Sequence, residues 1–342
     1  MTDRQARASE GDGAILVVPF QWIGDFVRAH TAVRILTARF PGRPIDMVAS
    51  PLCAPLTRFM PELRAAVVEP HVRGRLSLAA AFRFARRLRD RHYRAAIIMP
   101  GTVKAALAPF LAGIPRRTGW RGEMRYGLVN DMRSGEFDHI HIGMRCAMLA
   151  MPPMEREPVD LPPPRLEVSA ADLAAWRRRT GIAEDGPPII AIAPGSNGPE
   201  RRWPLERYVA LAAAAAAAGF EVWVMGGPSE RTMAATIRAA LIPAAAERLR
   251  DFTDTDLADA VYQAAAADVF VGNDSGLLHL AAATGTPCVA IYLASFHDRT
   301  GPFNANVLPL RDEPQGHGPL SPAEVFARAR ALIPAATVTV PS

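Results

Sequence analysis

The chain has 342 residues, of which 49% are hydrophobic, and its formal net charge is +5. This composition excludes wholesale disorder, and the length favours two domains over one. The first residues, MTDRQARASEGDG, lack the order of a signal peptide. The three cysteines lie far apart without a C-x-x-C pair, which argues against a disulfide scaffold or a zinc cluster and favours a reducing, cytoplasmic setting.

Residues 1–150 have the pattern of strands alternating with helices. Short apolar runs predict buried strands at AILVVPF, IDMVAS, AAVVEP and AAIIMP, each ending in a turn signal. We expect a helix after the first strand, to about Phe40, and another in the arginine-rich run AAAFRFARRLRDRHYRAA, with a solvated basic face. Apolar strands alternating with helices indicate a parallel sheet that is covered on both faces.

A proline-rich segment interrupts this pattern. Residues 151–166, MPPMEREPVDLPPPRL, contain six prolines, and proline at this density cannot continue a helix or a central strand. We therefore predict a linker here, between an N-terminal domain (1–150) and a C-terminal domain (167–342). In the second domain the alternation restarts at PPIIAIAPGS, FEVWVMGG, ADVFVGND and PCVAIY. Two doubly wound domains predict ligands at a cleft, beyond the carboxyl ends of the strands.

The stretch from Ser275 to Phe296 has no Asp, Glu, Lys or Arg and is long enough to cross a bilayer. It follows a polar turn, and Gly285 and Pro287 interrupt it, which argues against a single membrane helix. We predict that the strand ADVFVGND precedes this stretch, that SGLLHLAAATG forms a helix of about three turns ending at Gly285, and that TPCVAIY forms the next strand.

The net charge is unevenly distributed. Residues 1–150 hold 23 basic and 12 acidic residues, a net charge of +11, whereas residues 151–342 hold 16 and 22, a net charge of −6. All basic residues except Lys104 are arginine, which favours bidentate binding of phosphate or carboxylate. The imbalance predicts an anionic partner for the first half. A genome rich in GC explains arginine over lysine but not the imbalance.

A first polar turn, in PFQWIGDFVRAH, places Asp25 directly after the first predicted strand. A carboxylate at a helix N-terminus is stabilised as the anion, so one interpretation is a first-turn aspartate with no further role. Its position on the ligand edge of the sheet allows another, a general base that faces the cleft.

A second polar turn, APGSNGPERRWP, follows the first strand of the second half. Gly195 lets the main chain approach a ligand, Ser196 and Asn197 offer hydrogen-bond donors, and Arg201 offers charge, a combination that suits phosphate or pyrophosphate. The alternative is an ordinary turn, since the segment is neither a Walker A loop nor a G-x-G-x-x-G fingerprint.

A third polar turn, GNDSGLLHL, opens the predicted helix after the third strand of the second half. Ser275 and Gly276 place free N–H groups at the helix start, which is a ready anion site. His279 lies one turn further on the same face and either faces the ligand or packs in the core. The carboxylates are too scattered along the chain to predict a metal site.

At these residues the chain resembles the ADP-heptose:lipopolysaccharide heptosyltransferases of glycosyltransferase family 9, the heptosyltransferase II subgroup most of all. The motifs that carry the resemblance are WIGDFVRAHTAVRILTARFPGRPIDMVASPLCAPLTRFMPEL, APGSNGPERRWPLERYVALA and GNDSGLLHLAAATGTPCVAIY. It implies a GT-B fold, in which two Rossmann-like doubly wound domains face each other across a cleft. The first domain would bind the acceptor and the second the nucleotide-sugar.

The resemblance implies inverting, metal-independent transfer of heptose from ADP-L-glycero-D-manno-heptose to the lipopolysaccharide inner core, with no cofactor and no nucleic acid. The reaction would take place in the cytoplasm, with peripheral contact at the inner face of the membrane. Asp25 would be the base that deprotonates the acceptor. The residues implied in donor binding are Ser196, Asn197, Arg201, Asp274, Ser275, Gly276 and His279.

An anionic acceptor fits the basic first half. Its expected lining is the stretch RTGWRGEMRYG, where Trp120, Arg121 and Arg125 combine charge with an aromatic ring; the alternative is a solvated loop. The chain departs from the family where a Gly-Pro-Thr turn is usual, because Leu293-Ala294-Ser295 stands there. Two other functions therefore stay open, a family 9 enzyme with another nucleotide-sugar donor and a non-catalytic nucleotide-sugar-binding protein.

Overall fold

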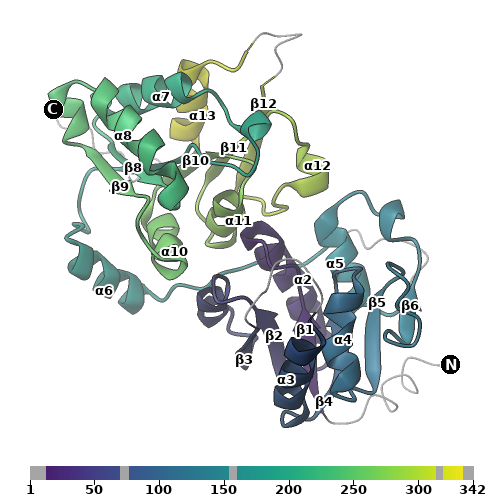
Figure 1. Ribbon diagram of the computed structural model, residues 1–342. Helices are drawn as coiled ribbons and strands as arrows, with labels where there is room; N and C mark the ends of the chain where they lie inside the picture. Colours follow the sequence, from purple (N-terminus) through teal and green to yellow (C-terminus); the bar gives the residue numbers. More distant parts are fainter. Residues whose placement is uncertain (1–12, 70–76, 154–159, 313–318, 334–342) are drawn as a thin grey trace. The chain divides into compact units, whose positions relative to one another are not determined.

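The structure is a computed structural model that describes residues 13–69, 77–153, 160–312 and 319–333. The chain divides into two compact units, Met1–Pro164 and Arg165–Ser342. Each unit contains one parallel six-stranded sheet with helices on both faces (Figure 1). The boundary between the units falls within the proline-rich segment that we predicted as a linker, of which residues 154–159 lie outside the described part.

Unit 1 has the strand order β3-β2-β1-β4-β5-β6, and all its strand pairs are parallel. Its strands are β1 (Ala14–Val18), β2 (Ile45–Ala49), β3 (Ala65–Val68), β4 (Tyr93–Ile98), β5 (Arg116–Trp120) and β6 (Asp131–Arg133). Its helices are α2 (Ile23–Arg39), η1 (Ala54–Phe59), α3 (Leu78–Arg89), α4 (Val103–Leu111), η2 (Glu136–Asp138) and α5 (Ile142–Ala150).

The helices of unit 1 divide between the two faces of its sheet. Helices α3 and α4 bury Phe84, Leu88 and Ala106 against Leu16 and Ile98 on one face. Helices α2 and α5 pack against each other and cover the other face (Figure 1). The central strand β1 is buried along its whole length, which explains why its sequence is a continuous apolar run and does not alternate with polar residues.

Unit 2 has the strand order β12-β11-β10-β7-β8-β9, again all parallel. Its strands are β7 (Ile189–Ala193), β8 (Glu221–Met225), β9 (Leu249–Phe252), β10 (Val269–Asn273), β11 (Cys288–Tyr292) and β12 (Val307–Arg311). Its helices are α6 (Ala170–Thr180), η3 (Pro199–Arg201), α7 (Leu205–Ala217), η4 (Pro228–Glu230), α8 (Arg231–Ala240), α9 (Pro243–Ala246), α10 (Leu257–Ala266), α11 (Gly276–Ala283), α12 (His297–Thr300) and α13 (Pro322–Leu332).

The main core of unit 2 lies between its sheet and helices α7, α8, α9 and α13, and includes Ile192, Val224, Val271 and Ile291. Helices α6, α10 and α11 cover the other face (Figure 1). There Trp176 meets Trp223 edge to face, with ring centroids 6.1 Å apart, a favoured aromatic geometry.

The predicted strands are confirmed, but the arginine-rich helix is shorter than we predicted. Helix α3 ends at Arg89, and β4 begins at Tyr93, inside the run that we assigned to the helix. His92 turns the chain between them with a φ of 52°. Tyr93 is buried, so the chain leaves the helix to place this ring in the core.

The uncharged stretch after Asp274 forms α11 and β11 and does not form one long helix, as predicted. Helix α11 has 8 residues, which is about two turns and so shorter than the three turns that we predicted. Within the described ranges, no helix combines the length and the apolar character that a bilayer crossing requires.

Helix α2 is fastened to its surroundings by polar contacts. The fully buried His30 lies 3.0 Å from the Glu62 carboxylate, and Arg34 lies 3.6 Å from it. Burial acts to raise the pKa of Glu62, but the hydrogen bond with His30 and the Arg34 guanidinium outweigh it and lower this pKa to about 2. Thr31 and Arg34 also donate to the carbonyls of Pro162 and Pro163, at 2.9 and 2.6 Å.

We expect Glu62→Gln to reduce the free energy of unfolding at pH 7 by about 2 kcal/mol, measured by denaturant titration. Because the pKa of Glu62 is depressed in the folded state, its contribution is present above its usual value of 4.5 and is lost as pH falls toward about 2. The difference between wild type and variant should therefore shrink over that range. A difference that stays constant down to pH 3 would contradict this role. Glu247→Gln, at an exposed position, is the control.

Candidate functional site

The first polar turn places Asp25 in the first turn of α2, directly beyond the carboxyl end of β1. Its carboxylate forms an ion pair with Arg28, one turn further along the helix, and both side chains are largely buried. Trp22 precedes the helix and makes no side-chain cap hydrogen bond. The charge of Asp25 is therefore matched by Arg28, a pairing that is compatible with both interpretations of this residue.

Asp25 lines a cavity of about 290 Å³ at the carboxyl edge of the unit 1 sheet. Phe20, Met99 and Trp120 reach this cavity from the ends of β1, β4 and β5. The full lining is Phe20, Trp22, Asp25, Met99, Trp120, Glu136, Ile142, Arg145, Cys146 and Leu149. A cavity at this edge of a doubly wound sheet is the expected place for a ligand.

A second carboxyl group, that of Glu136, lines the same cavity. Burial raises the pKa of Glu136 above its usual value, against the opposing charges of Arg145 and Arg125. Burial also raises the pKa of the neighbouring Cys146 thiol to about 12. The cavity thus holds one carboxylate that is paired with arginine and one carboxyl group whose pKa is raised by burial.

The three residues that we predicted in acceptor binding have different environments. Trp120 is buried at the end of β5, lines the Asp25 cavity, and donates its indole N–H to the Arg145 carbonyl at 3.2 Å. Arg121 is exposed. Arg125 is fully buried and donates to the carbonyls of Pro100 and Trp120. Arg125, which we predicted in acceptor binding, is thus buried, and its guanidinium supports the main chain of the loop.

The polar turns of unit 2 meet around Asn273, the last residue of β10, which is fully buried. Its amide Nδ2 donates to the carbonyls of Pro194 and Gly195 at 2.8 and 3.4 Å. Its Oδ1 accepts a hydrogen bond from the main-chain N–H of Trp203 at 2.9 Å. Asn273 therefore holds both ends of the turn that follows β7.

The same two turns are joined at Asp274. Ser196 is buried and donates its hydroxyl to the main-chain carbonyl of Asp274 at 2.9 Å. The carboxylate of Asp274 accepts the Thr300 hydroxyl at 2.9 Å and lies 3.9 Å from the Arg201 guanidinium. Asn197 is exposed on the turn.

Helix α11 begins beside these residues. Ser275 precedes its first residue, Gly276, in an extended conformation and makes no side-chain cap hydrogen bond. Its hydroxyl is buried and has no hydrogen-bond partner in the described part of the chain. The N–H groups and the hydroxyl at this helix start are suited to an anion. His279 is buried one turn further.

The structure therefore gathers Ser196, Arg201, Asp274, Ser275 and Gly276 at the carboxyl ends of β7 and β10.

Sequence reasoning did not assign roles to several residues of this edge. The most important of them is Asn273, which holds the turn after β7. The polar Gly-Asn-Asp turn after an apolar strand is the sequence feature that could have indicated it. Glu230 was also missed: a Cβ on Gly195 would lie 2.6 Å from its side chain, so the turn after β7 passes close to Glu230. Ser295, in the turn after β11, has a buried hydroxyl without a partner among the described residues.

No group of three or more His, Cys, Asp or Glu side chains that could hold a metal ion occurs in the described ranges. Cys53, Cys146 and Cys288 are all buried free thiols.

We expect Asn273→Ala to lower the free energy of unfolding by about 3 kcal/mol, since it leaves buried main-chain groups of the β7 turn without partners. The Trp203 amide should exchange its hydrogen faster, as measured by NMR. Asn306→Ala is the matched control, because Asn306 bonds the carbonyls of Ala282 and Thr286 at 3.1 and 2.5 Å, outside this turn. Unchanged exchange at Trp203 in Asn273→Ala would show that Asn273 does not hold the turn.

Comparison with known proteins agrees with this architecture. A family described as glycosyltransferase family 9 (heptosyltransferase) matches residues 81–319. Lipopolysaccharide heptosyltransferase 2 of Escherichia coli (strain K12) is 35% identical over 305 residues, which cover 87% of each chain. Lipooligosaccharide heptosyltransferase 2 of Haemophilus influenzae is 33% identical over 310 residues, which cover 87% of this chain and 88% of that protein.

Among solved structures, E. coli ADP-heptose lps heptosyltransferase II matches with a TM-score of 0.85 and 33% identity, over 93% of this chain and 98% of that chain. E. coli heptosyltransferase WaaC with ADP matches in fold with a TM-score of 0.71 and 18% identity, over 93% and 99% of the two chains. The two parallel sheets therefore form a GT-B fold, and the chain belongs to glycosyltransferase family 9, the heptosyltransferases.

Proposed function

We propose that this heptosyltransferase transfers heptose from ADP-L-glycero-D-manno-heptose to the lipopolysaccharide inner core, with inversion and without a metal ion. The proposal rests on a pair of sites. In unit 1, Asp25 forms an ion pair and lines a cavity. In unit 2, the N-terminus of α11 is suited to binding an anion and lies beside Arg201. The names of the relatives from E. coli and H. influenzae support the same substrate class.

Unit 2 holds the donor in this proposal. The N–H groups at the start of α11 and the unpartnered Ser275 hydroxyl receive phosphate oxygens. Arg201, whose side chain is 41% exposed, supplies positive charge to the diphosphate. Ser196, Asn197 and His279 complete the diphosphate site, and Asp274 contacts the donor sugar.

Unit 1 supplies the base. Asp25 takes the proton of the acceptor hydroxyl as the oxygen attacks the anomeric carbon. The bond from that carbon to the diphosphate breaks, and its electron pair leaves with ADP. Arg201 and the α11 N–H groups stabilise the charge that develops on the leaving group. Attack on the face opposite ADP inverts the configuration.

The acceptor is anionic in this proposal, which fits the charge of +11 over residues 1–150. Trp120 and Arg145 line the Asp25 cavity, and Arg121 is exposed nearby in sequence. Acceptors of this kind are carried by the membrane, so we place the reaction in the cytoplasm, at the inner face of the cytoplasmic membrane.

One observation favours a different donor as the second candidate function. The turn Leu293-Ala294-Ser295 follows β11 at the same edge of the sheet as the donor turns, and the Ser295 hydroxyl is buried without a partner among the described residues. A comparison of thermal stabilisation by ADP-heptose and by other nucleotide-sugars separates the two donors. Stabilisation without turnover for every donor would indicate a non-catalytic binding protein.

We expect Asp25→Asn to keep its affinity for ADP and to lower turnover by about 10²–10⁴-fold, the usual contribution of a positioned base. Glu136→Gln, in the same cavity, should lose less, which identifies the carboxylate that acts. Turnover is also measured in the presence of a strong chelator, which should not reduce it if the reaction needs no metal ion. Wild-type turnover in Asp25→Asn would make Asp25 a helix-stabilising residue only, and abolition by the chelator would contradict transfer without a metal.

We expect Arg201→Ala to weaken ADP binding about 10–150-fold, because hydrogen bonds to charged groups contribute about 1.5–3 kcal/mol. Ser275→Ala should lose less, since its hydroxyl is neutral. Calorimetric titration with ADP measures both. Arg248→Ala, which removes an exposed arginine bonded to the Gly219 carbonyl, is the control. Equal ADP affinity in all three variants and wild type would move the donor site away from these turns.

A further inference from the structure

Glu136 is the second acidic residue of the Asp25 cavity, and the proposed reaction gives it no role. It is the first residue of η2, in the segment between β6 and α5, and it is half-buried. Its carboxylate accepts no hydrogen bond and forms no ion pair in the described part of the chain. Asp25, in contrast, is paired with Arg28. Glu136 therefore presents an unpaired carboxylate to whatever occupies the cavity.

The two carboxylates lie close to the same thiol on the cavity wall. Burial is the main cause of the raised pKa of Cys146, and the charges of Asp25 and Glu136 add to it. The charges of Arg28 and Arg145 oppose this effect. Because Cys146 also lines the cavity, a ligand group that reaches Asp25 lies near Glu136 as well.

The Asp25 cavity has no excess of positive charge. Among its described lining residues two are acidic, Asp25 and Glu136, and one is basic, Arg145. Arg145 also has contacts of its own: its Nε donates to the His139 carbonyl at 2.9 Å, and its guanidinium lies 5.0 Å from the centre of the Phe137 ring. An anionic group in this cavity would therefore meet two carboxylates and one guanidinium, which is unfavourable.

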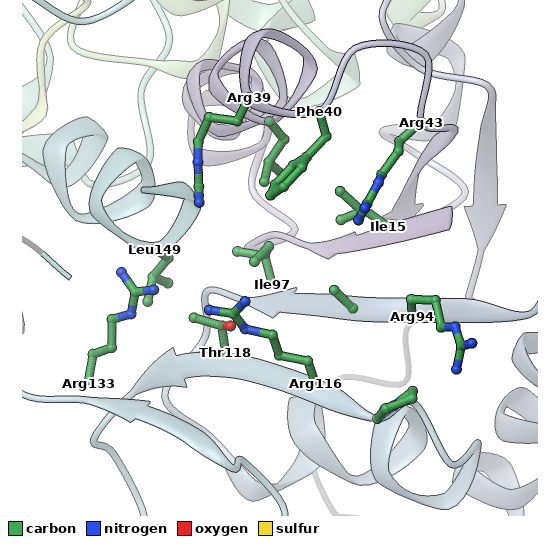
Figure 2. A pocket seen from close by; sticks show the side chains of 13 residues that line it. Ile15, Arg39, Phe40, Arg43, Arg94, Ile97, Arg116, Thr118, Arg133 and Leu149 are labelled. Carbon is green, nitrogen blue, oxygen red and sulfur yellow. The ribbon is translucent and has the colours of Figure 1, made fainter. Parts of the chain in front are cut away.

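The arginines at the other end of α2 do not reach this cavity. Arg39, Arg43 and Arg116 line a different cavity, of about 260 Å³, beside the end of the helix (Figure 2). Asp25 lies in the first turn of α2 and Arg39 is its last residue. At 1.5 Å per residue the two are about 20 Å apart along the helix. The basic residues in Figure 2 therefore do not offset the two carboxylates.

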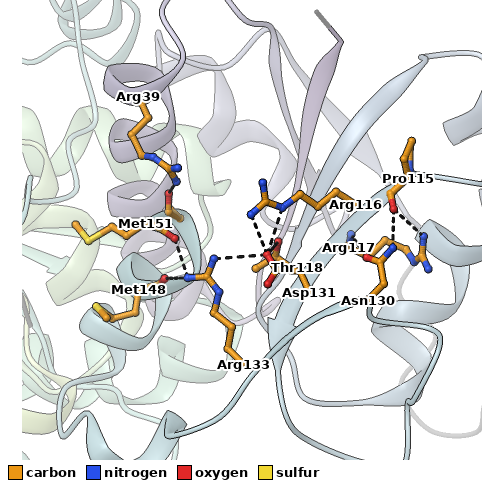
Figure 3. Close-up of polar contacts among 11 residues, drawn as sticks. Arg39, Pro115, Arg116, Arg117, Thr118, Asn130, Asp131, Arg133, Met148 and Met151 are labelled. Atoms are coloured by element: carbon orange, nitrogen blue, oxygen red, sulfur yellow. Dashed lines mark hydrogen bonds and ion pairs between the residues drawn. The ribbon is translucent and has the colours of Figure 1, made fainter. Parts of the chain in front are cut away.

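The segment that carries Glu136 is anchored where it leaves β6. Arg133 of β6 donates to the Met148 carbonyl at 2.7 Å, which joins this strand to α5 (Figure 3). Asp131 of β6 accepts the Thr118 hydroxyl at 2.8 Å, which joins it to β5 (Figure 3). The position of Glu136 therefore depends on a strand with contacts on two sides.

The same segment is anchored again beyond η2. The ring of His139 lies against that of Trp120, with centroids 5.6 Å apart. Trp120 in turn donates its indole N–H to the Arg145 carbonyl at 3.2 Å. A carboxylate held between two anchored points loses less conformational freedom when it binds a ligand than one on a free loop does.

We propose that Glu136 binds adjacent hydroxyl groups of a neutral sugar ring in the Asp25 cavity, and that the two carboxylates keep the anionic groups of the acceptor out of it. The proposal rests on the proposed function, in which unit 1 binds the acceptor. An ionised carboxylate has two acceptor oxygens and no donor, which matches a pair of hydroxyl groups, and its hydrogen bonds are stronger than those of neutral groups.

The walls and the size of the cavity suit one sugar ring. Phe20, Trp22 and Trp120 supply aromatic surface for the carbon atoms of the ring, and the charged groups supply its polar contacts. The volume of about 290 Å³ is at the lower end of the range of about 300–1,000 Å³ that is usual for ligand pockets. The anionic groups of the acceptor then lie outside this cavity.

Two methyl glycosides with the same ring test this selection. Methyl glucoside is neutral, and methyl glucuronoside carries a carboxylate. Each is titrated into the full chain with ADP at saturation, at pH 8 and constant ionic strength, and binding is followed by tryptophan fluorescence, since Trp22 and Trp120 line the cavity. We expect wild type to bind the neutral glycoside about tenfold or more tightly than the charged one, because like charges repel.

Three variants assign the selection to Glu136. Glu136→Gln removes the charge and keeps the shape, so it should weaken the neutral glycoside about tenfold and reduce its preference over the charged glycoside several-fold. Glu136→Asp keeps the charge and should keep the preference. Asp138→Asn is the matched control, because Asp138 belongs to the same short helix, is exposed and does not line the cavity. It should bind both glycosides like wild type.

Steady-state kinetics give a second readout. With ADP-heptose as donor, Glu136→Gln should raise the acceptor KM about tenfold, leave the donor KM unchanged, and lower kcat less than Asp25→Asn does. A wild type without turnover would contradict the proposed transfer of heptose. In contrast, the role of Glu136 is overturned if wild type binds the neutral glycoside no better than the charged one or not at all. It is also overturned if Glu136→Gln keeps the wild-type preference, or if Asp138→Asn changes as much as Glu136→Gln.

Discussion

The donor edge of unit 2 depends on the hydrogen bonds of one buried amide. Asn273 ends β10 and bonds main-chain groups at both ends of the turn after β7, so two turns from neighbouring strands become one rigid surface. Ser196 can then reach the carbonyl of Asp274, and Arg201 comes near its carboxylate. The start of α11, where we propose that the diphosphate binds, therefore faces a turn that is held at a fixed distance from it.

In unit 1, ion pairs hold the candidate site residue in position, whereas in unit 2 the amide of Asn273 does so. Asp25 is held by Arg28 within α2, and α2 is held by His30 and Arg34 at Glu62. The position of the carboxylate therefore depends on a chain of charged side chains along one helix. The general base that we propose needs a defined position, and the ion pair with Arg28 contributes to that position.

The sequence was sufficient to predict the doubly wound architecture and the polar turns at the carboxyl edges of the sheets. The apolar runs of β7, β10 and β11 are unbroken, and parallel strands end at a common edge, so the polar turns could be placed together. Strand β5 was missed because Arg116 and Arg117 break its apolar pattern. Arg125 was misplaced because its burial depends on carbonyls of Pro100 and Trp120, and a local sequence pattern contains no information on such partners.

The arginines of unit 1 are in large part connectors of the main chain. Arg89, Arg117, Arg133 and Arg145 each donate to carbonyl groups of other segments. A lysine, with a single nitrogen, could not reproduce their forked contacts, so the preference for arginine has a structural basis beyond codon usage. Lysine loses its charge near pH 10.4, whereas arginine does not. The positive charge of these arginines is therefore retained in alkaline solution.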